Sequence, residues 1–159
     1  MHMAAISAQS IVLLIFTLFS VPVAICDAKT MHVPASVVYA GCLLLLLFRF
    51  IYTRDVLVFC VIAAVCSAAL FTIVRLLSDK GIGWGDIKYS VFCGLSAGFS
   101  ASFAGYAFSA CLCGVWFAVM HRRGRIANES KIPFVPFMAL GIFLAQAAAI
   151  GVAAFAKRG

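Results

Sequence analysis

Acidic residues are the scarcest reactive side chains in this sequence, and one of them has a distinctive setting. Only five Asp and Glu occur among 159 residues. Asp86 lies between Gly85 and Lys88 at the edge of a long apolar stretch, where a charge is expensive, since one at the bilayer centre costs at least ~2.5–3.5 kcal/mol. Gly83 and Gly85 permit positive φ and carry no side chain, so backbone or substrate can approach the carboxylate closely. Taken alone, such a motif is also consistent with a polar loop between two helices.

A second aspartate, Asp27, occupies a matching place at the end of the first apolar stretch. Two carboxyl groups that share a site cannot both ionise cheaply, so one proton is held between them. The ionised carboxyl can take a proton from a water that attacks a peptide carbonyl, while the protonated one polarises the carbonyl oxygen. Such a pair titrates as a unit. No Ser/His/Asp set competes with it, because His2, His32 and His121 lie on different segments.

The composition predicts an integral membrane protein. The chain is 65% hydrophobic and 11% charged, with a mean hydropathy of +1.15, whereas soluble domains are roughly 25% charged. The net charge of +7 does not indicate a nucleic-acid partner, because the basic residues lie between apolar runs and form no patch with interleaved aromatics. Seven cysteines are present without a C-x-x-C pair, so we interpret them as packing residues and expect neither a metal site nor a cofactor.

The apolar stretches predict an all-α bundle of about six transmembrane helices in a single domain, residues 1–159. A span needs ~20 apolar residues, and the uncharged stretch from Tyr89 to Met120 is too long for one span. We therefore expect a break within Gly98–Ser102, after a short fourth helix. A cleaved signal peptide is disfavoured at the start because no basic residue precedes the apolar run. The other expected spans are about Ala4–Cys26, Pro34–Phe50, Val56–Leu77, Ala101–Met120, and a last one from the Ile132–Phe137 block to about Ala156.

Lys and Arg are unequally divided between alternate loops, which predicts the orientation. The richer loops are expected in the cytoplasm, which places both termini outside and both Asp27 and Asp86 at the cytoplasmic face. Asp55 then falls outside, as a solvated charge paired with Arg54. The richer set holds eight residues, Lys29, Arg75, Lys80, Lys88, Arg122, Arg123, Arg125 and Lys131, and the other holds four, Arg49, Arg54, Lys157 and Arg158.

Three motifs together resemble those of the type IV prepilin peptidases. They are Asp27 with Lys29 and Val33-Pro34, the G-x-G-D-x-K block Gly83–Lys88, and the I-P-F-x-P-F-x-x-x-G block Ile132–Gly141. They occur in the family's order and span most of the chain.

The resemblance implies an intramembrane aspartyl protease of the GxGD class with Asp27 and Asp86 as its dyad. Its partners would be the lipid bilayer and the basic leader of a prepilin or pseudopilin, cut at the cytoplasmic face of a bacterial inner membrane. Two departures stand out. Ala35 stands where the family usually has Asn, and the chain lacks the N-terminal insert with paired C-x-x-C motifs that accompanies N-methylation. It is therefore similar to the short forms, and methyltransferase activity is in doubt.

The supporting residues of the motifs each admit two interpretations. Gly83 and Gly85 either let substrate approach the dyad or only form a tight turn, and Lys88 either tunes Asp86 or marks the membrane interface. Pro133 and Pro136 withhold two backbone N–H groups, which fits a substrate-facing element or a helix start. A small proton-coupled transporter and a non-catalytic pilus-assembly subunit are the rival functions, but relay carboxylates usually lie deep within spans rather than at their ends.

Overall fold

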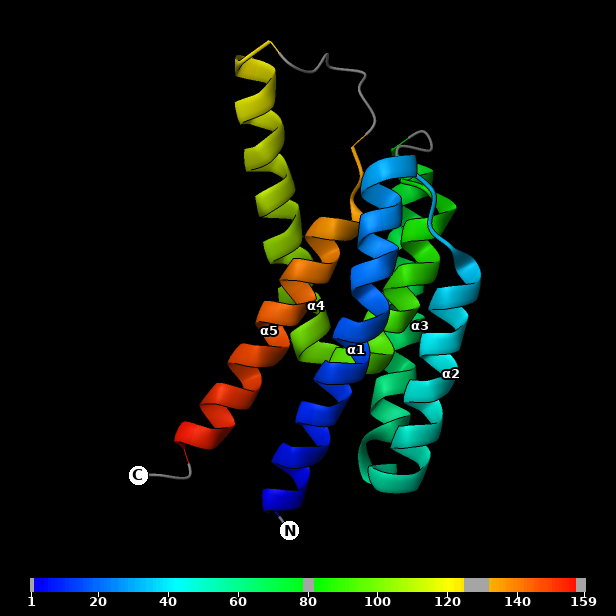
Figure 1. Cartoon of the computed structure of the whole chain (residues 1–159), viewed down its shortest axis with the longest axis vertical. Coiled ribbons are helices and arrows are strands. Elements are labelled where there is room, and N and C mark those ends of the chain that lie inside the picture. Colours follow the sequence, from blue (N-terminus) through cyan, green and yellow to red (C-terminus); the bar gives the residue numbers. More distant parts are fainter. Residues whose placement is uncertain (1, 79–81, 125–131, 157–159) are drawn as a thin grey trace.

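The computed structural model describes residues 2–78, 82–124 and 132–156, and these form five α-helices. Each helix is long and apolar enough to cross a membrane, which confirms the predicted all-helical, multi-pass membrane protein. No strand occurs within the described residues. The helices pack side by side as a bundle (Figure 1). They are α1 His2–Thr30, α2 Ala35–Tyr52, α3 Arg54–Leu77, α4 Trp84–Arg122 and α5 Val135–Phe155.

The count of helices differs from the expected six because α4 contains the predicted break without a separating loop. Gly98 has φ 70° and ψ −173°, a conformation that only glycine adopts readily. Helix resumes at once after it, rather than from about Ala101. Residues 84–97 rise by about 21 Å, less than the ~30 Å hydrocarbon core, whereas residues 99–122 rise by about 36 Å. The expected fourth and fifth helices are thus the two halves of one element.

The break folds α4 back on itself, so both of its ends lie at the same end of the bundle (Figure 1). The Tyr106 hydroxyl in the second half donates a hydrogen bond of 3.0 Å to the Ser90 carbonyl in the first half. The start of α1 and the end of α5 lie at the opposite end of the bundle (Figure 1). Residues 84–97, the part of α4 before the break, carry Asp86 at their start. We call this segment the half-helix.

An aromatic core holds the half-helix against α1 and α2. Phe92 stacks on Phe16 of α1, with ring centroids 5.3 Å apart. The Tyr89 hydroxyl donates to the Ser20 hydroxyl at 2.7 Å. Gly41 of α2 makes room for Phe92, since a Cβ atom at Gly41 would lie 2.8 Å from its ring. These contacts join the helix whose last turn carries Asp27 to the helix whose first turn carries Asp86.

Glycines bring α3, α4 and α5 into close contact, which is how small residues act at helix interfaces in membranes. A Cβ atom at Gly94 would lie 2.5 Å from the Ala64 Cα atom of α3. One at Gly141 of α5 would lie 2.5 Å from the Gly105 carbonyl oxygen of α4. Backbone therefore meets backbone at both crossings, and neither position has space for a side chain.

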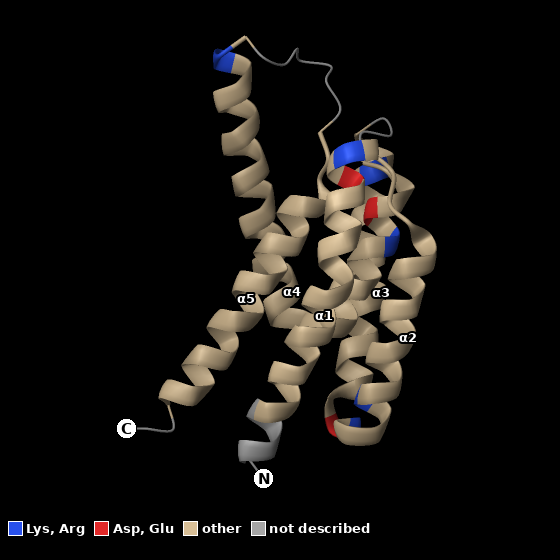
Figure 2. Cartoon of the chain, in the orientation of Figure 1, with Lys and Arg blue, Asp and Glu red and all other residues tan. Residues whose placement is uncertain are grey.

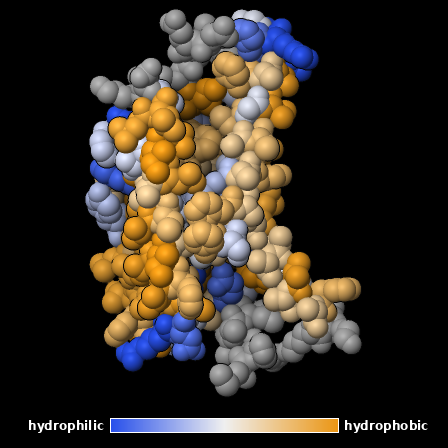
Figure 3. All heavy atoms as spheres, turned by 180° about the vertical axis from the view of Figure 1, so that it is seen from behind, coloured by the Kyte–Doolittle hydropathy of each residue, from blue (hydrophilic) through white to orange (hydrophobic). Residues whose placement is uncertain are grey.

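Charged residues gather at the two ends of the bundle, while apolar side chains cover most of its middle (Figures 2 and 3). Arg49 is an exception: it was counted with a loop but lies inside the bundle, 2% exposed. Arg54 is exposed as expected, but its Nε donates to the Phe50 carbonyl and forms no ion pair with Asp55. Lys80, Arg125, Lys131, Lys157 and Arg158 lie outside the described residues.

Candidate active site

Asp27 lies in the last turn of α1, almost buried at 5% exposure. Its backbone carbonyl accepts a hydrogen bond of 2.9 Å from the amide of Met31. Met31 adopts the left-handed conformation with φ 55°, which is how many α-helices end. One carboxylate oxygen, Oδ2, accepts a hydrogen bond of 3.2 Å from the backbone amide of Val135. The Asp27 carboxyl group is thereby fixed between the end of α1 and the start of α5.

Val135 can donate to Asp27 because it is the first residue of α5. The first amides of a helix have no partner within the helix, and Pro136, in the first turn, removes one such amide at no cost. Pro136 therefore opens α5, one of its two predicted roles. Pro133 lies just before the helix, and neither proline lines the cavity described below.

Asp86 lies in the first turn of α4, half-buried. Its Oδ2 atom accepts a hydrogen bond of 3.0 Å from the backbone amide of Gly83, the residue that precedes the helix. This contact is the acidic half of a capping box, and it places a carboxylate at the positive end of the half-helix. Asp86 thus stabilises the start of the helix that carries it.

The two glycines beside Asp86 do not use the left-handed conformation that their sequence allowed. Gly83 has φ −73° and ψ 152°, and Gly98 and Gly124 are the glycines with positive φ in the described residues. Gly85 is needed for packing instead: a Cβ atom there would lie 2.5 Å from Cγ2 of Val33. Val33 is buried in the α1–α2 connection. Gly85 therefore lets the start of α4 approach the segment that follows Asp27.

One cavity of about 280 Å³ brings the two aspartates together. Asp27 comes from the end of α1 and Asp86 from the start of α4, and the two carboxyl groups are near enough to interact electrostatically. The end of α1 and the start of α4, which carry them, lie at the end of the bundle opposite the start of α1 (Figure 1). Gly83, Gly85 and Lys88, which the sequence predicted to support the site, also line the cavity. The lining consists of Asp27, Met31, His32, Val33, Gly83, Trp84, Gly85, Asp86 and Lys88.

Lys88 contacts an aromatic ring rather than a carboxylate. Its Nζ atom lies 5.9 Å from the centroid of the Tyr39 ring of α2, within the range of a cation–π contact. Within the described ranges, no ion pair joins Lys88 to Asp27 or Asp86. The contact favours the predicted role at the membrane interface, although Lys88 also lines the cavity.

Arg75, near the end of α3, fixes the backbone that leads into Asp86. The sequence motifs did not identify this residue. Its guanidinium group donates a hydrogen bond to the Ile82 carbonyl. The same group lies 4.9 Å from the centroid of the Trp84 ring. Both partners flank Gly83, whose amide binds Asp86. Arg75 therefore positions the backbone that caps the aspartate.

We expect Arg75→Gln to speed amide exchange in residues 87–90, the first amides with partners in α4, by about tenfold. A hydrogen bond to a charged group contributes ~1.5–3 kcal/mol and an exposed cation–π contact ~0.5–1 kcal/mol, part of which glutamine retains. Hydrogen–deuterium exchange with mass spectrometry measures the effect. Arg54→Gln is the matched control, since Arg54 also binds a carbonyl and an aromatic ring, those of Phe50. Equal exchange of residues 87–90 in both variants would contradict the role of Arg75.

Comparison with models of known protein families identifies one that matches this chain. The sequence model of the type IV leader peptidase family matches residues 12–119, more than half of the chain. The chain belongs to the type IV leader peptidase family. The matched range contains both Asp27 and Asp86. Membership in the type IV leader peptidase family supports a peptidase function with a protein substrate, in agreement with the resemblance of the three motifs. No curated protein and no solved structure matches the chain.

Proposed function

We propose that the protein is an intramembrane aspartyl endopeptidase that removes the basic leader from type IV prepilins or pseudopilins. Asp27 and Asp86 are its catalytic dyad. The observation that carries the proposal is that these two carboxyl groups, from helices distant in sequence, line one cavity at one end of the bundle. Family membership independently supports the leader-peptidase class.

The proposed chemistry needs only the two carboxyl groups and a water. One carboxyl group, ionised, takes a proton from the water as its oxygen attacks the scissile carbonyl carbon. The other, protonated, donates a hydrogen bond to the carbonyl oxygen, on which negative charge develops. When the C–N bond breaks, the leaving nitrogen receives a proton from the dyad, and an acid and an amine result. No metal or cofactor takes part in the proposed step.

The proposed location is the cytoplasmic face of a bacterial inner membrane, with both termini outside. Cytoplasmic loops are rich in Lys and Arg, and the richer set includes Lys29, in the last turn of α1, and Arg122, in the last turn of α4. The end of α1 and both ends of α4 lie at the end of the bundle that carries the two aspartates (Figure 1). Lys88 lines the cavity and has no acidic partner among the described residues. N-methylation of the new pilin end is not part of the proposal.

Cleavage by the purified protein tests this function directly. The protein in detergent is incubated with a synthetic peptide that carries a basic leader and the first apolar residues of a type IV pilin. Mass spectrometry should detect two fragments whose masses sum to that of the peptide plus one water. A transporter or an assembly subunit leaves the peptide intact. Intact peptide in the presence of folded, monodisperse protein, across several pilin sequences, would refute the proposal.

We expect Gly85→Ala to lower the cleavage rate about tenfold, because the new Cβ atom would lie 2.5 Å from Val33. Overpacking of this kind costs ~1–3 kcal/mol or moves the backbone, and here the backbone that moves carries Asp86. Adding Val33→Ala to the same chain should restore the rate to within about threefold, since contacting residues couple. Steady-state cleavage by wild type, both single variants and the double variant measures this. A double variant no faster than Gly85→Ala alone would show that Val33 is not the obstacle.

A further inference from the structure

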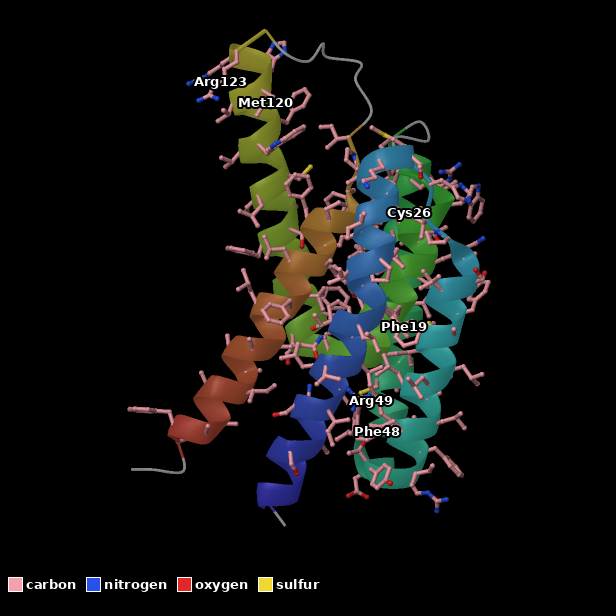
Figure 4. All side chains as sticks on the ribbon, in the orientation of Figure 1. Phe19, Cys26, Phe48, Arg49, Met120 and Arg123 are labelled. Carbon is pink, nitrogen blue, oxygen red and sulfur yellow. The ribbon has the colours of Figure 1, made fainter. Side chains whose placement is uncertain are left out.

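Arg49 is a buried charge that the proposed chemistry does not use. It belongs to α2, is 2% exposed, and lies in the lower half of the bundle, on the side of α2 that faces the other helices (Figure 4). Its Nε atom donates to the Leu95 carbonyl at 2.8 Å, and Nη2 donates to the Ser96 carbonyl at 2.6 Å. No acidic side chain pairs with it among the described residues.

The contacts of Arg49 follow from the break in α4. The last carbonyls of a helix have no amide partner within the helix, and Gly98 ends the half-helix shortly after Leu95 and Ser96. In the middle of a membrane protein, water cannot satisfy these groups, so each unpaired one costs several kcal/mol. A guanidinium group supplies two donors in a fixed geometry, and a cation is favourable at a helix C-terminus. Arg49 thus caps the half-helix at the end opposite Asp86.

Gln146 connects α5 to the same end of the half-helix. Its Nε2 atom donates to the Ser96 hydroxyl at 3.1 Å, and that hydroxyl donates to the Cys93 carbonyl at 2.9 Å. Gln146 and Ser96 are both 0% exposed. The end of the half-helix is therefore fixed by α2 through Arg49 and by α5 through Gln146.

The half-helix, which carries Asp86, and α5, whose Val135 amide binds Asp27, are thus both fixed at Ser96. Asp86 precedes Ser96 by ten residues, a rise of about 15 Å along the half-helix. Val135, whose amide binds Asp27, precedes Gln146 by eleven residues, a rise of about 16.5 Å along α5. The similar rises bring Asp86 and the Asp27-binding amide to a similar depth. A shift of the half-helix along its axis would move Asp86 relative to Asp27.

We propose that Arg49 is a positioning residue, which sets the depth of Asp86 relative to Asp27 by capping the far end of the half-helix. The inference rests on the proposed function for its effect on catalysis. The Leu95 and Ser96 carbonyls that Arg49 binds lie about ten residues along the half-helix from Asp86, so Arg49 acts through the helix and does not contact the substrate.

Arg49→Met should lower kcat for leader cleavage about 100-fold with KM unchanged, since a misplacement of about 1 Å can cost 10²-fold in rate. Arg49→Lys, which still donates to a carbonyl, should restore kcat to within about tenfold of wild type. Arg54→Met is the matched control, because Arg54 is also near the α2–α3 end but exposed, and its kcat should equal that of wild type. Equal kcat in Arg49→Met and Arg54→Met, or no gain from lysine, would overturn the proposal.

A second variant covers the case in which Arg49→Met does not fold. Gln146→Leu removes the other tie to Ser96 while keeping an apolar side chain of similar size, and it should lower kcat about tenfold at constant KM. If Arg49→Met is not monodisperse, full activity in both Gln146→Leu and Arg49→Lys would refute the proposal.

Hydrogen–deuterium exchange separates this inference from the proposed function. If wild type cleaves no leader peptide, the proposed function fails, but the role of Arg49 can still be measured. Amides of residues 87–97 should then exchange at least about tenfold faster in Arg49→Met and Gln146→Leu than in Arg54→Met, with little change in residues 56–74 of α3. Equal exchange of residues 87–97 in all variants would show that the cap does not hold the half-helix.

Discussion

Asp27→Asn and Asp86→Asn are each expected to lower cleavage of a leader-bearing peptide by about 10³-fold or more. General acid–base catalysis contributes ~10²–10⁴-fold, and an amide can neither take a proton from water nor return it to the leaving nitrogen. The amide oxygen of the introduced asparagine can still accept the hydrogen bond that the carboxylate now accepts, from Val135 at the first position and from Gly83 at the second. The fold should therefore persist while the chemistry is lost.

The measurement is the initial rate of fragment formation, with the folded state of each variant checked by size-exclusion chromatography and circular dichroism. Asp55→Asn is the control, since Asp55 is exposed in the first turn of α3, and α3 begins at the far end of the bundle (Figure 1). It should cleave at the wild-type rate. A variant of Asp27 or Asp86 that cleaves as fast as Asp55→Asn would remove that residue from the dyad.

Gly94→Val should have the largest effect on stability. The added Cβ atom would lie 2.5 Å from Cα and 2.7 Å from the backbone nitrogen of Ala64. Both are backbone atoms of α3, so no rotamer change relieves the clash and the two helices must separate. We expect a loss on the order of 3 kcal/mol, because the crossing of α3 and α4 holds the half-helix in the bundle.

Thermal unfolding in a fixed detergent, followed by circular dichroism, measures this loss. Gly114→Val is the matched control on the same helix, because a Cβ atom at Gly114 would meet no atom within 4 Å. Its Tm should stay within a few degrees of wild type. Equal Tm values for the two variants would mean that the close contact at Gly94 contributes nothing to stability.

Hydropathy predicted the helices well because lipid imposes a length and a composition on each span. It also located the break at Gly98, since an uncharged stretch as long as Tyr89–Met120 cannot be one ordinary span. It did not predict that helix resumes at once after Gly98. Whether a single residue or a loop separates two helices depends on which groups satisfy the freed carbonyls, and here one of those groups is Arg49, from another helix.

The two aspartates were identifiable because acidic residues are rare here and both end apolar stretches. The residues that hold them were harder to find. The Val135 amide binds Asp27 across 108 residues of sequence, and backbone donors leave no mark in side-chain patterns. Gly85 was selected because glycine permits positive φ and has no side chain, and only the second property is used, since φ at Gly85 is not positive. The sequence could not identify Val33 as the neighbour, because their contact arises only when two distant segments pack. Arg75 and Arg49 were counted only as residues that set the membrane orientation, because that is the usual role of a basic residue near a helix end.

The break at Gly98 also limits how the chain can vary in length. Because the half-helix is fixed at Leu95 and Ser96, one residue inserted between Asp86 and this point would turn the carboxylate by about 100° around the helix and displace it by about 1.5 Å. Beyond Gly114, where α4 has open space beside it, an insertion would leave the cavity untouched. Spacing is therefore constrained between Asp86 and Ser96, and it is free beyond Gly114.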